Sequence, residues 1–115
     1  MPSKKDVLAA DMGRRIAARR NQLGLTQAEA AEKAGLTQQF FACVETGTKN
    51  IRAESIIGVS KALNVSTDYL LTGEVTDIDR NRLIKMFESL DTVRFMEMET
   101  IIHDILQFGG YNMDT

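Results

Sequence analysis

Apolar residues recur along the chain at the three- and four-residue spacing of helices, and no segment alternates as a strand does. Glycines and capping residues divide the pattern, because the single proline lies at position 2. The chain is therefore predicted to be all-α. The expected helices include three at about 6–23, 38–46 and 53–63. A short helix is expected between Thr26 and Gly35, and another between Ser66 and Gly73. Two more follow Thr76, separated by a turn at Asp91-Thr92, and the last ends near Phe108.

The boundaries of the second and third helices carry the clearest signals. Thr26 and Glu29 have the spacing of a capping box, in which each side chain accepts a hydrogen bond from the other residue's backbone N–H. Gly35 stands where a left-handed residue ends a helix. Thr37 then caps the third helix, and Gly47 closes it. Two short helices joined by a tight glycine turn, with Ala31 where they cross, predict a helix-turn-helix.

The third helix has two unlike faces. Leu36, Phe41 and Val44 form its core side, and the other side presents two glutamines and small residues. Such a surface suits the major groove, where glutamine pairs with adenine and small groups meet thymine methyls. The candidate DNA-contacting residues of this face are Thr37, Gln38, Gln39, Phe40, Ala42, Cys43 and Thr46. For Phe40, packing against the second helix is an equally weighted alternative.

The charge distribution is compatible with nucleic acid, although the net charge is −2. Residues 1–74 hold ten Lys/Arg against eight Asp/Glu, a balance of +2, and residues 75–115 hold four against eight, a balance of −4. A duplex responds to local potential rather than to the total charge. The basic cluster that supports DNA binding comprises Lys4, Lys5, Arg14, Arg15, Arg19 and Arg20.

The change of charge near residue 74 also predicts a domain boundary, between a DNA-binding domain (1–74) and an oligomerisation segment (75–115). Thr76 and Asp79 resemble another capping box, which opens the first of two helices with a wide apolar surface. We expect these helices to form a hairpin that dimerises, with self-packing of the hairpin onto its own domain as the alternative. Its interface residues are Leu83, Phe87, Leu90, Phe95, Met98, Ile102 and Ile105.

The segment from Leu25 to Gln39, ending in Val44-Glu-Thr-Gly, resembles the Xre/Cro family of lambda-repressor-like domains. Residues 61–73 resemble the closing segment of the same family, so that the likeness covers about 11–73. It implies a five-helix DNA-binding domain, followed here by the two-helix hairpin. It also implies base contacts by Gln38 and Gln39 and a phosphate contact by Gln27.

The loop after the third helix departs from the family, because Ile51 and Arg52 stand where many relatives have proline and a serine cap. We expect the loop to differ in shape while still supplying contacts to phosphate or the minor groove. Its candidate residues are Thr48, Lys49, Asn50 and Arg52.

Arg20 lies on the apolar line of the first helix, between Ile16 and Leu23, where an unpaired charge is costly. The family pattern pairs the residue at this position with the glutamate matching Glu45. The resemblance therefore implies a structural ion pair between Arg20 and Glu45.

These features predict a sequence-specific transcriptional regulator that represses by binding a roughly palindromic operator as a homodimer. The alternatives are an antitoxin that regulates its own operon and a protein-interaction module without DNA. We expect no enzyme, cofactor or metal site, because no phosphate-binding loop, nucleophile–base pair or ligand cluster is apparent. One cysteine and no secretory signal or long apolar run predict a cytoplasmic protein without a membrane segment.

Overall fold

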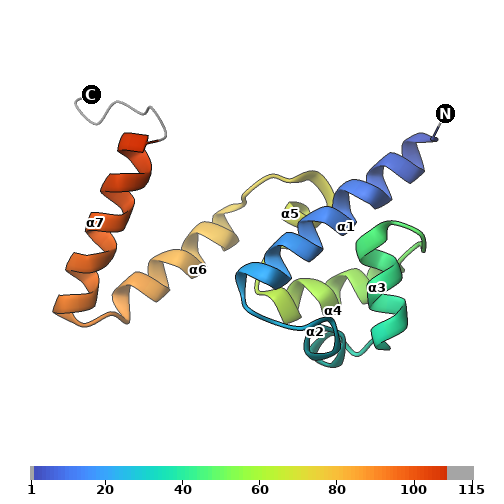
Figure 1. Cartoon of the computed structure of the whole chain (residues 1–115), viewed down its shortest axis with the longest axis horizontal. Coiled ribbons are helices and arrows are strands. Elements are labelled where there is room, and N and C mark those ends of the chain that lie inside the picture. Colours follow the sequence, from blue (N-terminus) through green and yellow to red (C-terminus); the bar gives the residue numbers. More distant parts are fainter. Residues whose placement is uncertain (1, 109–115) are drawn as a thin grey trace. The chain divides into compact units, whose positions relative to one another are not determined.

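The computed structural model describes residues 2–108, which contain helices and no strands (Figure 1). This confirms the predicted all-α class. The chain divides into two compact units, Met1–Asp79 and Arg80–Thr115, so that the division falls within one helix. The helices are α1 (Lys4–Gln22), α2 (Gln27–Ala34), α3 (Gln38–Thr46), α4 (Ala53–Leu63), α5 (Thr67–Thr72), α6 (Asp77–Glu88) and α7 (Thr92–Phe108).

The predicted caps define α2 and α3. Thr26 Oγ1 accepts the backbone N–H of Glu29 at 3.0 Å, and Glu29 Oε1 accepts that of Thr26 at 3.0 Å. Gly35 ends α2 with a φ of 73°, a left-handed conformation that L side chains rarely adopt. Thr37 caps α3 in turn by accepting the Phe40 N–H at 3.1 Å. The short turn between the two helices is thus fixed by local sequence.

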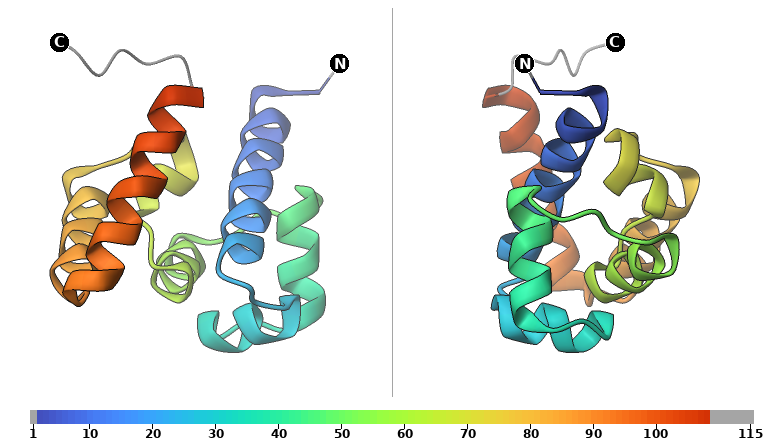
Figure 2. Two further views of the ribbon diagram at one scale, coloured as in Figure 1. Left: turned by 60° about the vertical axis from the view of Figure 1, so that its left-hand side comes forward. Right: turned by 90° about the vertical axis from the view of Figure 1, so that its right-hand side faces the viewer.

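The first unit is built around a core shared by α1 to α5. α3 lies beside α1, and α2 lies across the neighbouring ends of both (Figure 2). Each large side chain buried in this core contributes roughly 1.5–3 kcal/mol of hydrophobic stabilisation. The buried apolar residues are Met12, Ile16, Ala30, Ala31, Phe41, Val44, Val59, Leu63, Val65 and Leu70.

Gly13 allows α1 and α3 to meet at backbone distance. A Cβ atom at this position would lie 2.5 Å from the carbonyl oxygen of Val44 and would also overlap that of Glu45. The glycine is therefore required for this helix crossing, although it lies inside a helix, where glycine costs about 1 kcal/mol relative to alanine.

The position of Leu23 differs from the sequence prediction. It was expected on the buried face of the first helix, but its side chain is 39% exposed. α1 ends at Gln22, one residue earlier than expected, and Leu23 is its C-cap. The chain then turns through Gly24, so that Leu25 packs against the core instead.

In the second unit, α6 and α7 form the predicted pair of helices, joined by a turn at Asp91, whose carboxylate accepts the Arg94 N–H at 2.8 Å. Apolar side chains remain exposed here, as shown by Phe95 at 47% and Ile105 at 61%. An apolar groove of about 350 Å³ is lined by Phe87, Phe95, Glu99 and Ile102. No helix in the described part of the chain is long and apolar enough to cross a membrane.

Candidate nucleic-acid interface

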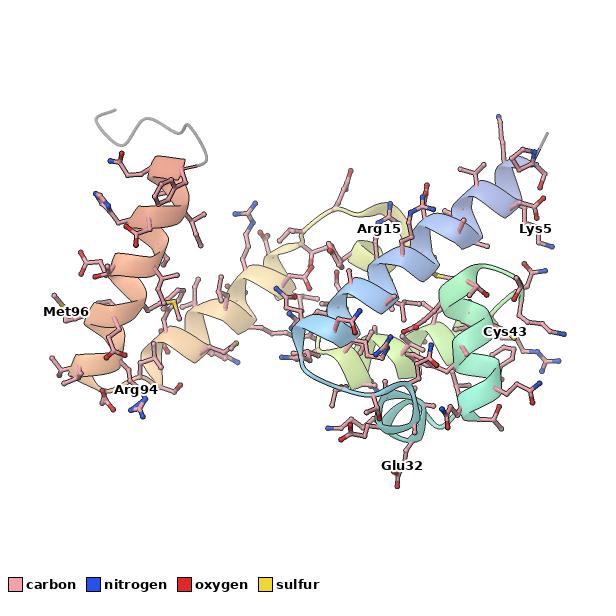
Figure 3. The ribbon with its side chains drawn as sticks, viewed as in Figure 1. Lys5, Arg15, Glu32, Cys43, Arg94 and Met96 are labelled. Carbon is pink, nitrogen blue, oxygen red and sulfur yellow. The ribbon has the colours of Figure 1, made fainter. Side chains whose placement is uncertain are left out.

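The outer face of α3 is polar at its start and small in its middle. Phe41 and Val44 point inward and are at most 1% exposed. Gln38 and Gln39 are exposed in the first turn, and Ala42 and Cys43 are half-buried one turn later. Cys43 is labelled on this helix in Figure 3. The helix therefore presents hydrogen-bonding groups in its first turn and only short side chains in the next turn.

Phe40 lies between these faces. Its side chain is half-buried and packs against the core cluster, which agrees with the packing alternative considered for it. Thr37, exposed at the N-cap, has its hydroxyl oxygen occupied by the Phe40 N–H. The outward polar groups at this end of α3 are the two glutamine amides, beside the exposed Thr37 hydroxyl, whose O–H is a donor as well.

Glu45 receives three hydrogen bonds from two helices. Arg20 Nε donates to its Oε2 at 2.6 Å, and Arg20 Nη2 donates to its Oε1 at 3.1 Å. Gln27 Nε2 also donates to Oε1, at 2.8 Å. The hydrogen bonding of Arg20 to the Glu45 carboxylate is the main reason that the pKa of Arg20 is raised. The ion pair implied by the family resemblance is present and holds α1 against α3.

The Gln27 hydrogen bond was not foreseen. It fixes one N–H of the half-buried amide toward Glu45, so that a phosphate contact has to use the other N–H or the backbone at the start of α2. Helical spacing could not show this bond, because the two residues lie 18 positions apart and on different helices.

The loop between α3 and α4 begins with an ordered turn. Thr46 Oγ1 and Thr48 Oγ1 both bond the Cys43 carbonyl oxygen, at 3.0 and 3.2 Å, and lie 3.0 Å from each other. Ile51 is half-buried and packs against the core. The loop's other predicted contact residues, Lys49, Asn50 and Arg52, are exposed.

Comparison with known proteins agrees with this geometry. The helix-turn-helix family model matches residues 16–70. YqaE of Bacillus subtilis (strain 168), described as an uncharacterized HTH-type transcriptional regulator, is 30% identical over 89 residues, covering 76% of this chain and 77% of YqaE. The chain belongs to the helix-turn-helix family. It is a DNA-binding transcriptional regulator of the Xre/lambda-repressor-like kind, and the family is one of regulators rather than enzymes.

Two further proteins extend the comparison. Repressor protein C2 of Salmonella phage P22 is 35% identical over 65 residues, which are 56% of this chain and 30% of that protein. The P22 c2 repressor bound to a synthetic operator superposes with a TM-score of 0.53 at 36% identity, covering 55% of this chain and 96% of that one. The SinR protein/SinI protein complex has the same fold over 80% of this chain and 94% of the matched chain, with a TM-score of 0.54 and 24% identity.

The arginines of α1 in this helix-turn-helix regulator belong to the basic cluster described from the sequence, and most of them bind groups of their own domain. Arg15 is labelled on α1 in Figure 3. Its Nη1 donates to the Leu70 carbonyl at 3.0 Å, and Arg19 Nε donates to the Leu63 carbonyl at 2.9 Å. With Arg20 bound to Glu45, three members of the predicted basic cluster bind groups of their own domain. Arg14 is exposed and pairs with Asp11. The charge pattern alone did not show the partners of Arg15 and Arg19, because these lie 55 and 44 residues away.

Asp79 is a residue of the regulator whose main contact the sequence analysis missed. The capping box with Thr76 was predicted and is present, but the same carboxylate also accepts two hydrogen bonds from Ser66. Burial raises the pKa of Asp79, but the hydrogen bonds from Thr76 and Ser66 outweigh it and lower the pKa to about 2. The carboxylate is therefore ionised throughout the neutral range.

Proposed function

We propose that this regulator is a repressor that binds a roughly palindromic operator in the cytoplasm as a homodimer and reads the major groove with α3. The observation that carries the proposal is the exposed Gln38–Gln39 pair at the start of a helix whose other face is buried. The likeness to a repressor of phage P22, and to its structure with operator DNA, supports the same reading.

Base recognition is assigned to the first turn of α3. A glutamine amide offers a donor and an acceptor that match adenine N6 and N7, and each such pair discriminates by about 1–3 kcal/mol. Ala42 and Cys43 leave room for the groove floor and offer apolar contact to thymine methyls. Gln38 and Gln39 are therefore the main determinants of the operator sequence.

Phosphate contacts are assigned to groups on either side of α3. Gln27 is positioned by Glu45 at the start of α2, where backbone N–H groups and the helix dipole favour an anion. Lys49, Asn50 and Arg52 are exposed on the following loop, which Ile51 anchors to the core. These contacts orient the domain on the duplex and carry no sequence information of their own.

The dimer is assigned to the second unit. Phe95, Ile102 and Ile105 are 47%, 39% and 61% exposed on α7, and the groove beside Phe87 is apolar. A second copy of the hairpin offers the same surface, as a twofold interface requires. Two recognition helices would then meet half-sites about one helical turn apart, at roughly 34–36 Å.

The function is tested by selecting bound duplexes from a random pool with the full chain. We expect an enriched inverted repeat with adenines in each half. Gln38→Ala and Gln39→Ala should each weaken binding to that operator by about 5- to 150-fold, the loss of one bidentate contact. Gln107→Ala removes an exposed glutamine from α7 and is the matched control. The assignment would be refuted if both α3 variants bound the operator with the affinity of the wild type.

Dimerisation is tested by sedimentation. Phe95→Asp places a charge in the apolar groove and should convert a dimer to a monomer, because an unpaired charge is costly to bury. Thr100→Asp adds the same charge at an exposed polar position of α7 and should leave the dimer intact. A wild-type chain that stays monomeric at micromolar concentration contradicts the dimer.

A further inference from the structure

The first turn of α6 is fastened to the DNA-binding domain. α6 begins at Asp77, and the first compact unit extends to Asp79, so that the helix starts in one unit and continues into the other. The connection from α5 is only residues 73–76, which include Gly73 in a left-handed conformation and the exposed Glu74 and Val75. Such a connection alone does not fix the direction of the following helix.

Asp79 supplies the fixed point. Its Oδ1 accepts the Ser66 N–H at 2.7 Å, and its Oδ2 accepts the Ser66 hydroxyl at 2.7 Å. Oδ2 also accepts the backbone N–H and the hydroxyl of Thr76, at 2.9 and 3.0 Å. One carboxylate thus caps its own helix and joins it to a residue 13 positions earlier.

Ser66 is itself buried and hydrogen-bonded within the first unit. It is 9% exposed, and its Oγ accepts the Tyr69 N–H at 3.0 Å as the N-cap of α5. The far end of α5 is bound to α1 through the hydrogen bond from Arg15 Nη1 to the Leu70 carbonyl at 3.0 Å. α1 in turn packs against α3 at Gly13. A continuous series of contacts therefore leads from Asp79 to the recognition helix.

We propose that Asp79, through Ser66, fixes the direction in which α6 leaves the DNA-binding domain and so sets the half-site spacing that the dimer accepts. The proposal rests on the dimeric operator binding proposed above. It makes Asp79 a positioning residue for sequence selection, although Asp79 itself is not assigned to the DNA surface.

A small change of direction at the start of α6 produces a large displacement at its other end. α6 has 12 residues and is about 18 Å long, so that a swing of roughly 20° at its start moves its other end by about 6 Å. That is nearly two base-pair steps of about 3.4 Å. Domains on a flexible tether accept a range of separations, whereas domains on a fixed helix accept only the matching one.

The first test measures affinity for operators whose half-sites are moved apart or together by single base pairs. The wild-type chain should prefer one spacing by about tenfold or more, a difference of about 1.4 kcal/mol. Asp79→Ala should bind all spacings within about threefold of one another. A wild-type chain indifferent to spacing, or an Asp79→Ala chain as selective as wild type, would overturn the proposal.

Two controls separate the link from other effects. Asp77→Ala removes a carboxylate from the same helical turn and should keep the wild-type spacing preference. Thr76→Ala weakens the α6 cap but leaves both Ser66 hydrogen bonds, and it should also keep that preference. Loss of selectivity in either control would assign the effect to charge or capping instead. Binding of an isolated half-site should be unchanged in all three variants.

The second test does not depend on DNA or on dimerisation. Backbone ¹⁵N relaxation of the full chain measures the rotational correlation time of each helix. In the wild type the first turn of α6 should have the same correlation time as α1, and in Asp79→Ala the two should differ. If no dimer forms, the proposed function fails while this result still decides the link. Independent tumbling of that turn in the wild type would overturn the inference. Circular dichroism would show that Asp79→Ala remains folded.

Discussion

Arg20 on α1 and Glu45 in the last turn of α3 are joined at two points, Nε to Oε2 at 2.6 Å and Nη2 to Oε1 at 3.1 Å. The two side chains are only 14% and 6% exposed, so that solvent screens the pair little. The same glutamate orients Gln27 at the start of α2. One buried acid thus holds the recognition helix to both helices that support it.

Removal of either partner should strongly destabilise the fold. Arg20→Ala or Glu45→Ala leaves an unpaired, nearly buried charge, which costs about 3–5 kcal/mol. Urea unfolding followed by circular dichroism measures this difference. Arg14→Ala breaks an exposed pair with Asp11 and should cost no more than about 1 kcal/mol.

Arg20→Met distinguishes a requirement for the charge from a requirement for the volume. With Glu45 intact, this variant should also be destabilised, because the acid loses its main partner. Stability equal to that of the wild type would show that the ion pair is not needed for the fold.

Gly13→Ala should destabilise the protein even though alanine is the better helix former. The new Cβ would overlap the carbonyl oxygens of Val44 and Glu45, and such overpacking costs about 1–3 kcal/mol. Ala18→Gly, at an exposed position of the same helix, measures the propensity effect alone at about 1 kcal/mol. Thermal unfolding compares the two, and a stabilised Gly13→Ala chain would contradict the close crossing.

Phosphate contacts by the loop should appear in the salt dependence of DNA binding. Log K falls as log salt rises, and Lys49→Ala and Arg52→Ala should each make this slope shallower by about 1. Each should also weaken binding to all operators to a similar extent. Lys61→Ala, at an exposed position on α4, should leave the slope unchanged. A changed order of preference among operators would instead assign these residues to base reading.

Acid should weaken the link between Ser66 and Asp79. The pKa of Asp79 is lowered from 3.8 to about 2, so that the stabilisation is complete above about pH 4 and is lost as the pH falls toward about 2. For this partly solvated side chain we expect about 1–2 kcal/mol in the free energy of unfolding. Asp79→Asn should flatten the stability profile in that range, whereas Asp77→Asn should not. Parallel profiles for wild type and Asp79→Asn would contradict the prediction.

Local signals in the sequence predicted the helices well. The Thr26–Glu29 box, the Thr37 cap and the glycine ends act over three or four residues, so that their geometry follows from spacing alone. The same spacing predicted the buried Phe41 and Val44 and the exposed Gln38 and Gln39. Leu23 was misplaced because helix periodicity does not show which residue ends the helix.

The sequence by itself determined the all-α class, the helix-turn-helix and the identity of the outward residues of α3, because each depends on neighbours within a turn or two of helix. Apart from the Arg20–Glu45 pair, which the family resemblance implied, only the tertiary structure decided which distant groups the polar side chains bond. Arg15 and Arg19 donate hydrogen bonds to backbone carbonyls 55 and 44 residues away. Asp79 accepts hydrogen bonds from Ser66, the N-cap of α5. The position of a charged residue in the sequence is the same whether its side chain binds a phosphate or a carbonyl group at the end of a helix. Its partner is fixed only when the helices pack.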